Sequence, residues 1–170
     1  MHFDLRAITI VSGGQTGADR AALDFAIEHG IAHGGWCPRE RLAEDGPISP
    51  RYQLRETPSL KYAQRTRWNV RDSDATALFT IAAQMQGGTA LTMDLAERLG
   101  KPWLHLAANA AESDSVAVQE AAARLSAFLA EHHVTSLNVA GPRASQEPGV
   151  ADFVGRVLGS VWAAGNARKM

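Results

Sequence analysis

The 170-residue chain is 45% hydrophobic, which allows one compact domain with a substantial core. A formal net charge of -1 and a pI near 6.6 argue against a protein that coats nucleic acid. No hydrophobic run approaches the roughly 20 residues that span a bilayer, and the N-terminal residues lack a signal-peptide pattern. A single cysteine, Cys37, leaves no disulfide framework and is typical of a reducing compartment. We therefore expect a cytoplasmic protein whose partner is a small molecule, with no nucleic-acid or membrane partner.

Strand-like and helix-like segments alternate along the chain. The apolar spacing predicts strands at 7–11, 32–37, 74–81, 102–106 and 135–140, and helices at 18–29, 61–71, 89–99, 115–132 and 149–164. Strands that alternate with helices in this way predict an α/β fold, with a mostly parallel sheet covered by helices on both faces. We expect residues 1–170 to form a single domain.

Residues 38–60 interrupt this alternation. They are rich in proline and charged residues, which predicts a long excursion without regular structure. Between Arg39 and Arg71, seven arginines and one lysine stand against four acidic residues, so the segment is basic. The planar guanidinium group suits carboxylate or phosphate recognition, although an ordinary solvated surface explains the same charges equally well.

Three turns of small residues follow three of the predicted strands. The first turn is Ser12-Gly13-Gly14-Gln15-Thr16-Gly17, the second is Gly87-Gly88-Thr89, and the third is Ala140-Gly141-Pro142-Arg143-Ala144-Ser145. The carboxyl ends of parallel strands lie at one edge of a sheet, so the turns can converge on one ligand there. Glycines allow close backbone approach, and the N-terminus of a following helix favours an anion. The pattern predicts a cradle for a nucleotide or a phosphorylated cofactor.

Polar side chains in and after these turns complete the predicted site. Each has a structural alternative: Asp19 can serve the helix dipole, Thr89 can be a helix N-cap, and Arg143 can be a surface residue. The spacing of His, Asp, Glu and Cys residues matches no metal site, and Cys37 has no evident base beside it. The candidate ligand-binding residues are Gly13, Gly14, Gln15, Thr16, Gly17, Asp19, Arg20, Gly87, Gly88, Thr89, Thr92, Gly141, Arg143 and Ser145.

Several segments together carry a family resemblance. They are the three turns with the residues that follow them, Gly35-Trp36-Cys37-Pro38, the stretches 43–48 and 52–57, and Lys101-Pro102. With these motifs the chain resembles the family of putative molybdenum cofactor carriers, a circularly permuted YpsA-like branch of the SLOG superfamily. The resemblance implies a Rossmann-like three-layer sandwich, a homo-oligomer, and molybdenum cofactor or a nucleotide as the ligand.

Two departures limit what the resemblance implies. The related LOG phosphoribohydrolases have catalytic glutamates after their glycine-rich turn, whereas residues 90–94 here contain no glutamate. Glycosidic cleavage needs a carboxylate, so a LOG-type hydrolase would have to use Glu44 or Asp45, the catalytic candidates, or Asp94. Glu40 stands where the family pattern suggests a glycine. Three hypotheses remain: a carrier, a nucleotide-processing hydrolase and a ligand sensor.

Overall fold

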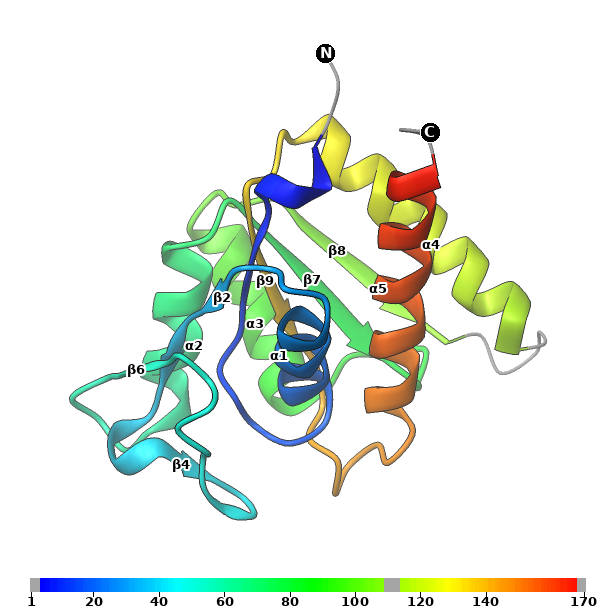
Figure 1. Ribbon diagram of the computed structural model, residues 1–170. Helices are drawn as coiled ribbons and strands as arrows, with labels where there is room; N and C mark the ends of the chain where they lie inside the picture. The colour runs from blue at the N-terminus through cyan, green and yellow to red at the C-terminus, as the bar shows by residue number, and fades with distance from the viewer. Residues whose placement is uncertain (1–3, 109–113, 168–170) are drawn as a thin grey trace.

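The computed structural model describes residues 4–108 and 114–167, so the first three residues of the N-terminal segment lie outside it. Its central sheet is parallel and has the strand order β2-β1-β9-β7-β8 (Figure 1). The predicted Rossmann-like three-layer sandwich is confirmed. The strands of this sheet are β1 (Thr9–Val11), β2 (His33–Gly34), β7 (Ala75–Thr80), β8 (Trp103–Ala107) and β9 (Ser136–Ala140).

Helices cover both faces of this sheet. On one face α1 packs against α5 and α5 packs against α4, and on the other face α2 packs against α3 (Figure 1). A short 3-10 helix precedes β1 at Leu5–Ala7. The helices are α1 (Ala18–Glu28), α2 (Tyr62–Arg71), α3 (Gly87–Arg98), α4 (Asp114–Glu131) and α5 (Val150–Ala167).

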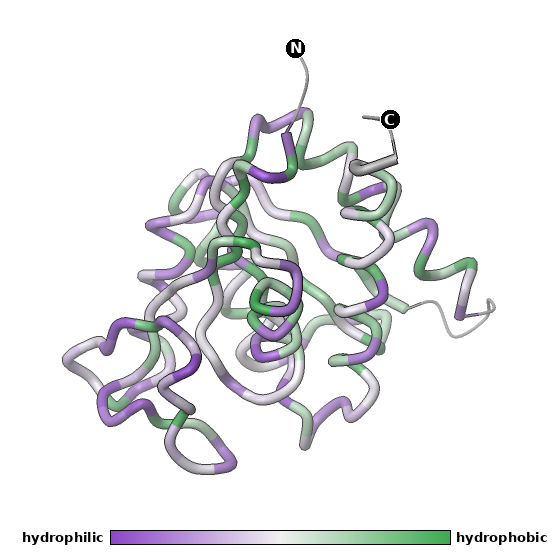
Figure 2. Tube along the Cα trace, in the orientation of Figure 1, coloured by the Kyte–Doolittle hydropathy of each residue, from purple (hydrophilic) through white to green (hydrophobic). Residues whose placement is uncertain are grey.

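The apolar run in β7 is explained by the position of this strand inside the sheet, between β9 and β8. Every residue of this strand is buried, because helices cover it from both sides. Ala77 pairs in register with Val139 of β9 and with Leu104 of β8. Figure 2 shows mainly hydrophobic residues along the inner strands, and long hydrophilic stretches in the segment that carries β4 and β6.

The strand order also positions the turns. The last strand of the chain, β9, lies between β1 and β7. The first turn follows β1, the third follows β9, and the second opens α3 after β7. Three neighbouring strands therefore send their carboxyl ends, and the turns beyond them, to one edge of the sheet.

The expected strand at 32–37 is wrong as a single element. Gly35 divides it with a φ of 133°, and a Cβ at this position would overlap the carbonyl oxygen of Ser12. The chain therefore turns out of the main sheet after β2. The following residues form β3 (Trp36–Cys37), which pairs with β6 (Arg55–Glu56) in a separate two-stranded sheet.

The expectation of an excursion without regular structure at 38–60 is wrong in part, because short regular pieces interrupt the irregular chain. The segment contains a 3-10 turn at Arg39–Arg41 and an antiparallel hairpin of β4 (Leu42–Ala43) and β5 (Gly46–Pro47). The Arg41 guanidinium organises the chain around it by donating to the backbone carbonyls of Ile48, Ser49, Tyr52 and Leu54. The excursion also has its own small core, formed by Leu23, Cys37, Ala43, Ile48, Tyr52 and Leu54. The prolines and charged residues of this segment predicted irregular structure, but the Arg41 hydrogen bonds and the small core give it a defined conformation.

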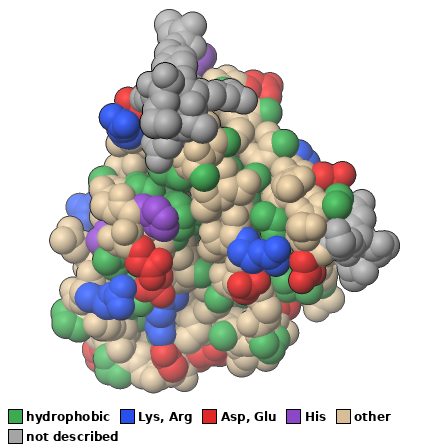
Figure 3. Space-filling model, turned by 45° about the vertical axis from the view of Figure 1, so that its right-hand side comes forward, with side chains coloured by type: hydrophobic (Ala, Val, Ile, Leu, Met, Phe, Trp, Pro, Cys, Tyr) green, Lys and Arg blue, Asp and Glu red, His purple; other side chains and the backbone are tan. Residues whose placement is uncertain are grey.

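The surface carries charges of both signs. On the face turned forward in Figure 3, acidic and basic side chains lie next to one another among uncharged and apolar ones. Within the described ranges, no helix combines the length and the apolar character needed to cross a membrane.

Candidate functional site

The first and third turns form a continuous wall. The Ser12 hydroxyl donates to the carbonyl oxygen of Val139 at 2.6 Å, and the Ala144 N–H donates to the Thr16 hydroxyl at 3.1 Å. Gly17 has a φ of 81°, and a Cβ there would lie 2.5 Å from the Pro142 carbonyl oxygen. The glycine therefore permits the two turns to pass at contact distance.

Gly141 has a comparable packing role beneath the site. A Cβ at Gly141 would overlap the Phe79 carbonyl oxygen and lie 2.7 Å from the Cβ of Ala18. The strand end of β9 thus passes closely between β7 and α1. Gly141 is needed for this packing whether or not it touches a ligand.

The second turn belongs to the first turn of α3. The helix begins at Gly87 with Gln86 as its N-cap residue, so the alternative that Thr89 is an N-cap is wrong. Thr89 and Thr92 are buried, and the Thr92 hydroxyl donates to the Gly88 carbonyl oxygen at 2.7 Å. Their hydroxyl oxygens keep the capacity to accept a hydrogen bond.

Residues of all three turns line one small cavity of about 100 Å³, which we call the three-turn cavity. Helix α2 closes it from the other side. Its lining residues are Gln15, Asp19, Tyr62, Ala63, Arg65, Thr66, Gly88, Thr89, Leu91, Thr92, Ala140, Gly141, Arg143 and Gln146.

A buried ion pair forms one wall of the three-turn cavity. Arg65 Nη1 lies 2.8 Å from Asp19 Oδ2, and the two side chains are 12% and 4% exposed. Burial raises the pKa of Asp19, although the charge of Arg65 and the Gln15 N–H act in the opposite direction. The Arg65 guanidinium occupies the space in which a Cβ at Gly13 would lie. Gly13 therefore gives room to an arginine of α2.

Two buried donors beside this ion pair have no acceptor among the described residues. Gln15 Oε1 accepts from the N–H groups of Thr16 and Glu44, each at 3.0 Å, so the amide orientation is fixed by its partners. The Gln15 Nε2 group then has no partner, and neither has Arg65 Nε. Buried donors normally have an acceptor. Both residues line the three-turn cavity, so an acceptor-rich ligand there would supply what is missing.

An aromatic ring lies near two guanidinium groups at the cavity. The Arg65 Cζ atom is 5.7 Å, and the Arg143 Cζ atom 5.2 Å, from the centre of the Tyr62 ring. These distances are within the range of cation–π attraction. The arginine-rich segment is visible in the sequence, but Tyr62 and Arg65 were not among the predicted site residues. Their spacing of three residues places them on one helix face, which was the available signal.

The tip of the 42–47 hairpin reaches the first and third turns. The Glu44 carboxylate accepts hydrogen bonds from the Thr16 hydroxyl and, at 2.6 Å, from the Ser145 hydroxyl. These bonds hold the pKa of Glu44 below its ordinary value. The Asp45 carboxylate accepts from Arg20 Nη2 at 3.0 Å, and this hydrogen bond with Arg20 lowers the pKa of Asp45. Both catalytic candidates are thus ionised and occupied by protein donors.

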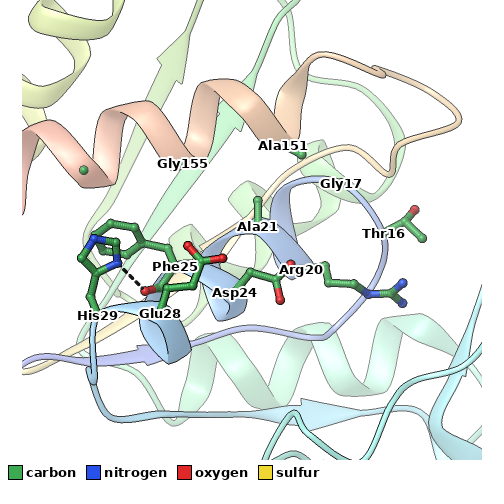
Figure 4. Close-up of a pocket in the computed structure, with 11 residues that line it drawn as sticks. Thr16, Gly17, Arg20, Ala21, Asp24, Phe25, Glu28, His29, Ala151 and Gly155 are labelled. Atoms are coloured by element: carbon green, nitrogen blue, oxygen red, sulfur yellow. Dashed lines mark hydrogen bonds between the residues drawn. The ribbon is translucent and has the colours of Figure 1, made fainter.

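A larger groove of about 530 Å³ runs along α1 and α5 (Figure 4). Thr16 and Arg20 lie at one end of it, and the His29 ring lies at the other, where Nδ1 is 2.9 Å from the Phe25 carbonyl oxygen (Figure 4). The groove touches the first turn but contains no residue of the second or third turn. It is therefore not where the turns converge.

The candidate ligand residues lie in several places: the three-turn cavity, the α1–α5 groove, and positions outside both. Those that line the three-turn cavity are Gln15, Asp19, Gly88, Thr89, Thr92, Gly141 and Arg143. Thr16, Gly17 and Arg20 line the α1–α5 groove. Ser145 binds Glu44, and Gly13 lies under Arg65. Gly14 faces the small core, since a Cβ there would lie 2.6 Å from Leu54 Cδ1, and Gly87, with a φ of 51°, starts α3.

Cys37, His33 and His105 are each held by packing or hydrogen bonds within the protein. Cys37 is fully buried, and burial raises the pKa of its thiol. The His33 ring accepts from the Gln53 N–H at 3.2 Å, and His105 lies 2.7 Å from the Thr80 hydroxyl. Burial lowers the pKa of both rings. In the portion of the chain that the structure covers, no group of three or more His, Cys, Asp or Glu side chains could hold a metal ion.

A comparison with protein families shows the family of this chain. Residues 10–162 match the circularly permutated YpsA SLOG family. The chain belongs to this family. A solved structure from Syntrophus aciditrophicus SB, described as a putative molybdenum carrier protein, is similar over the YpsA-type fold with a TM-score of 0.85 and 44% sequence identity. The similarity covers 92% of this chain and 96% of that one. No curated protein matches the chain.

The departure of this YpsA-type chain at Glu40 has a conformational meaning. Glu40 adopts a φ of 63°, in the left-handed region that favours glycine. The glycine that the family pattern suggests there suits this backbone. The next residue, Arg41, also has a positive φ, of 52°, and its guanidinium donates to the carbonyls of Ile48 and Tyr52.

Proposed function

We propose that this YpsA-type protein binds or carries a phosphorylated, nucleotide-like ligand in the three-turn cavity. The observation that carries the proposal is a pair of buried donors, Gln15 Nε2 and Arg65 Nε, that find no acceptor in the described part of the chain and belong to residues lining the cavity of the three turns. Arg143 adds a second guanidinium, which suits a phosphate. The Tyr62 ring offers an apolar surface near the two cations.

Molybdenum cofactor is the ligand we favour within this class. The residues present suit the phosphorylated organic part of such a cofactor, because they supply N–H donors, guanidinium groups and one aromatic ring. Arg143 would hold the phosphate, and Arg65 and Gln15 would donate to polar atoms of the organic part. When bound, the cofactor itself supplies the molybdenum chemistry. The name of the similar Syntrophus protein supports the choice.

The cavity volume sets a condition on binding. Ligand pockets usually measure about 300–1,000 Å³, whereas the three-turn cavity measures about 100 Å³. In this conformation it accepts a phosphate-sized group rather than a whole nucleotide. We propose that the surrounding segments, α2 or the 42–47 hairpin, move when the full ligand binds.

We also propose a cytoplasmic homo-oligomer with no nucleic-acid or membrane partner. The family resemblance supports the oligomer, and the single buried cysteine suits a reducing compartment. Neither property is needed for the binding proposal, which depends on the cavity alone.

A hydrolase is the alternative function, and one observation favours it. Glu44 is held ionised beside the first and third turns, where a carboxylate could stabilise positive charge on a sugar. Its lowered pKa makes it a poor general acid near neutral pH. The carrier therefore remains the proposed function.

Two glycines give a matched test of the binding site. A Cβ at Gly88 or at Gly155 meets nothing within 4 Å, but only Gly88 lines the three-turn cavity. We expect native mass spectrometry of the purified protein to reveal a retained phosphorylated ligand. Calorimetry with that ligand should then show at least tenfold weaker binding in Gly88→Ala and no change in Gly155→Ala. Equal affinities in folded variants would place the ligand elsewhere.

A further inference from the structure

The hairpin of residues 42–47 brings one carboxylate into a set of anion-binding donors. Its strands pair Leu42 with Pro47 and Ala43 with Gly46, so Glu44 and Asp45 form the turn. The residue Glu44 is exposed as a whole, yet its side chain is only 20% exposed. The backbone thus faces solvent while the carboxylate points into the protein.

The donors around the Glu44 carboxylate come from two turns. Thr16 of the first turn donates a hydroxyl, and Ser145 of the third turn donates its hydroxyl at 2.6 Å and its backbone N–H at 3.3 Å. Arg143 Nη1 lies 3.8 Å away. Hydroxyl groups, a backbone N–H and a guanidinium at the carboxyl ends of parallel strands are the groups that bind phosphate in proteins. Here the Glu44 carboxylate of the same chain contacts these donors.

The same arginine connects this donor set with the three-turn cavity. Arg143 lines the cavity and also lies against Glu44. It stacks near Tyr62, which lines the cavity as well. A phosphate that recruited the Arg143 guanidinium from either side would compete directly with Glu44.

The contacts of the Glu44 carboxylate are of a kind that a phosphate could replace, whereas the Asp45–Arg20 pair at the same tip would have to open when the hairpin moves. The Glu44–Arg143 pair is long, and its side chains are 20% and 33% exposed, which makes such a pair weak. The hairpin has only two residues in each strand. A phosphate carries more charge than a carboxylate and offers three acceptor oxygens. It can therefore take over the hydroxyl and guanidinium donors.

We propose that Thr16, Ser145 and Arg143 form a phosphate subsite, that Glu44 occupies it as an internal anion, and that a phosphorylated ligand binds by displacing the 42–47 hairpin. This inference rests on the proposed function and adds to it a built-in competitor. Glu44 then competes with the phosphorylated ligand and lowers the apparent affinity of the subsite for it.

The test compares Glu44→Ala with Glu40→Ala, using inorganic phosphate and AMP as probes. Both substitutions remove one negative charge from the same excursion, but the Glu40 side chain is 71% exposed and lies 3.8 Å from Arg39. We expect calorimetry to show about tenfold tighter phosphate binding in Glu44→Ala and no such gain in Glu40→Ala. Glu44→Gln keeps the hydrogen-bonding shape and should lie between. Equal or weaker phosphate binding in Glu44→Ala would overturn the inference.

Hydrogen exchange of the unmodified protein gives a second readout that needs no variant. The Glu44 N–H donates to Gln15 Oε1, and the Ile48 N–H donates to the Arg41 carbonyl oxygen at 2.7 Å. Saturating phosphate should speed exchange at Glu44 and leave Ile48, at the base of the hairpin, unchanged. Slower exchange at Glu44 would mean that the hairpin closes over the anion, which contradicts displacement.

The two probes separate this inference from the proposed function. Tighter phosphate binding in Glu44→Ala, with no AMP binding in any variant, would support the subsite and count against a nucleotide-like ligand. AMP binding that depends on Gly88 but is unaffected by Glu44→Ala would support the cavity and overturn the internal anion.

Discussion

Arg65 of α2 forms a 2.8 Å ion pair with Asp19 of α1 while its guanidinium lies directly over Gly13. Forty-six residues separate the partners in sequence. The pair joins a helix from each face of the sheet at the edge where the turns meet. A buried pair of this kind is costly to break, because the remaining charge has no partner.

Replacing Arg65 with alanine should therefore lower stability by about 3–5 kcal/mol. Burial already raises the pKa of Asp19 above 3.8, and the loss of Arg65 removes an opposing influence. A raised folded pKa contributes stability below the unfolded value and loses it as the pH rises through the folded pKa. Urea unfolding of Arg65→Ala should therefore show a smaller deficit at pH 5 than at pH 7.5.

The double variant Arg65→Ala/Asp19→Asn supplies the control for this prediction. It removes both charges, so it should regain part of the lost stability and should lose the pH dependence of the deficit. A deficit in Arg65→Ala that is the same at both pH values, with no recovery in the double variant, would show that the ion pair contributes only packing.

Glu40 offers a test of backbone strain. Its φ of 63° costs an ordinary residue about 1–2 kcal/mol, whereas glycine adopts it freely but loses more entropy on folding. Glu40→Gly should therefore raise the free energy of unfolding by about 0.5–1 kcal/mol. Glu40→Ala retains the Cβ and should show no gain. Chemical denaturation of both variants checks the prediction, and equal stabilities would mean that no strain is stored there.

Much of the fold follows from local sequence signals. The alternation of apolar strands and helices predicted the parallel layers, and the elements, apart from the strand expected at 32–37, lie within a few residues of the expected bounds. The position of β9 between β1 and β7 has no local signal, because it depends on which strand edges pair after crossover connections. The hairpin at 42–47 was missed because its strands have only two residues each, and the segment after it is ordered by backbone carbonyls that accept from the Arg41 guanidinium.

The candidate site also combines features that the sequence predicts with features that depend on tertiary contacts. The glycine-rich turns could be recognised from sequence, but the reason for each glycine could not. Gly14 faces Leu54 and Ile48 of the small core, so a larger residue there would disturb the fold as well as any ligand. Tyr62 and Arg65 reach the cavity only through the packing of α2 across the sheet edge. That packing is a tertiary property.

Arg143 provides a test of phosphate recognition. Lysine keeps its charge but loses the planar guanidinium that can bind two oxygens and stack on Tyr62. Calorimetry of Arg143→Lys should show weaker binding of AMP and little change for adenosine, with the melting temperature unchanged. Equal losses for both compounds would place Arg143 away from the phosphate.

The last prediction separates carrier from hydrolase. Hydrogen bonds from Ser145 and Thr16 keep the pKa of Glu44 low, and the hydrogen bond from Arg20 keeps that of Asp45 low, so both are poor general acids for a leaving base near neutral pH. We expect the purified protein to leave AMP and GMP intact over hours, as measured by chromatography of the free base. Glu44→Gln and Asp45→Asn should give the same flat baseline. Base release by the unmodified protein that disappears in either variant while AMP affinity is retained would identify an interaction made only in the transition state, and would put the hydrolase first.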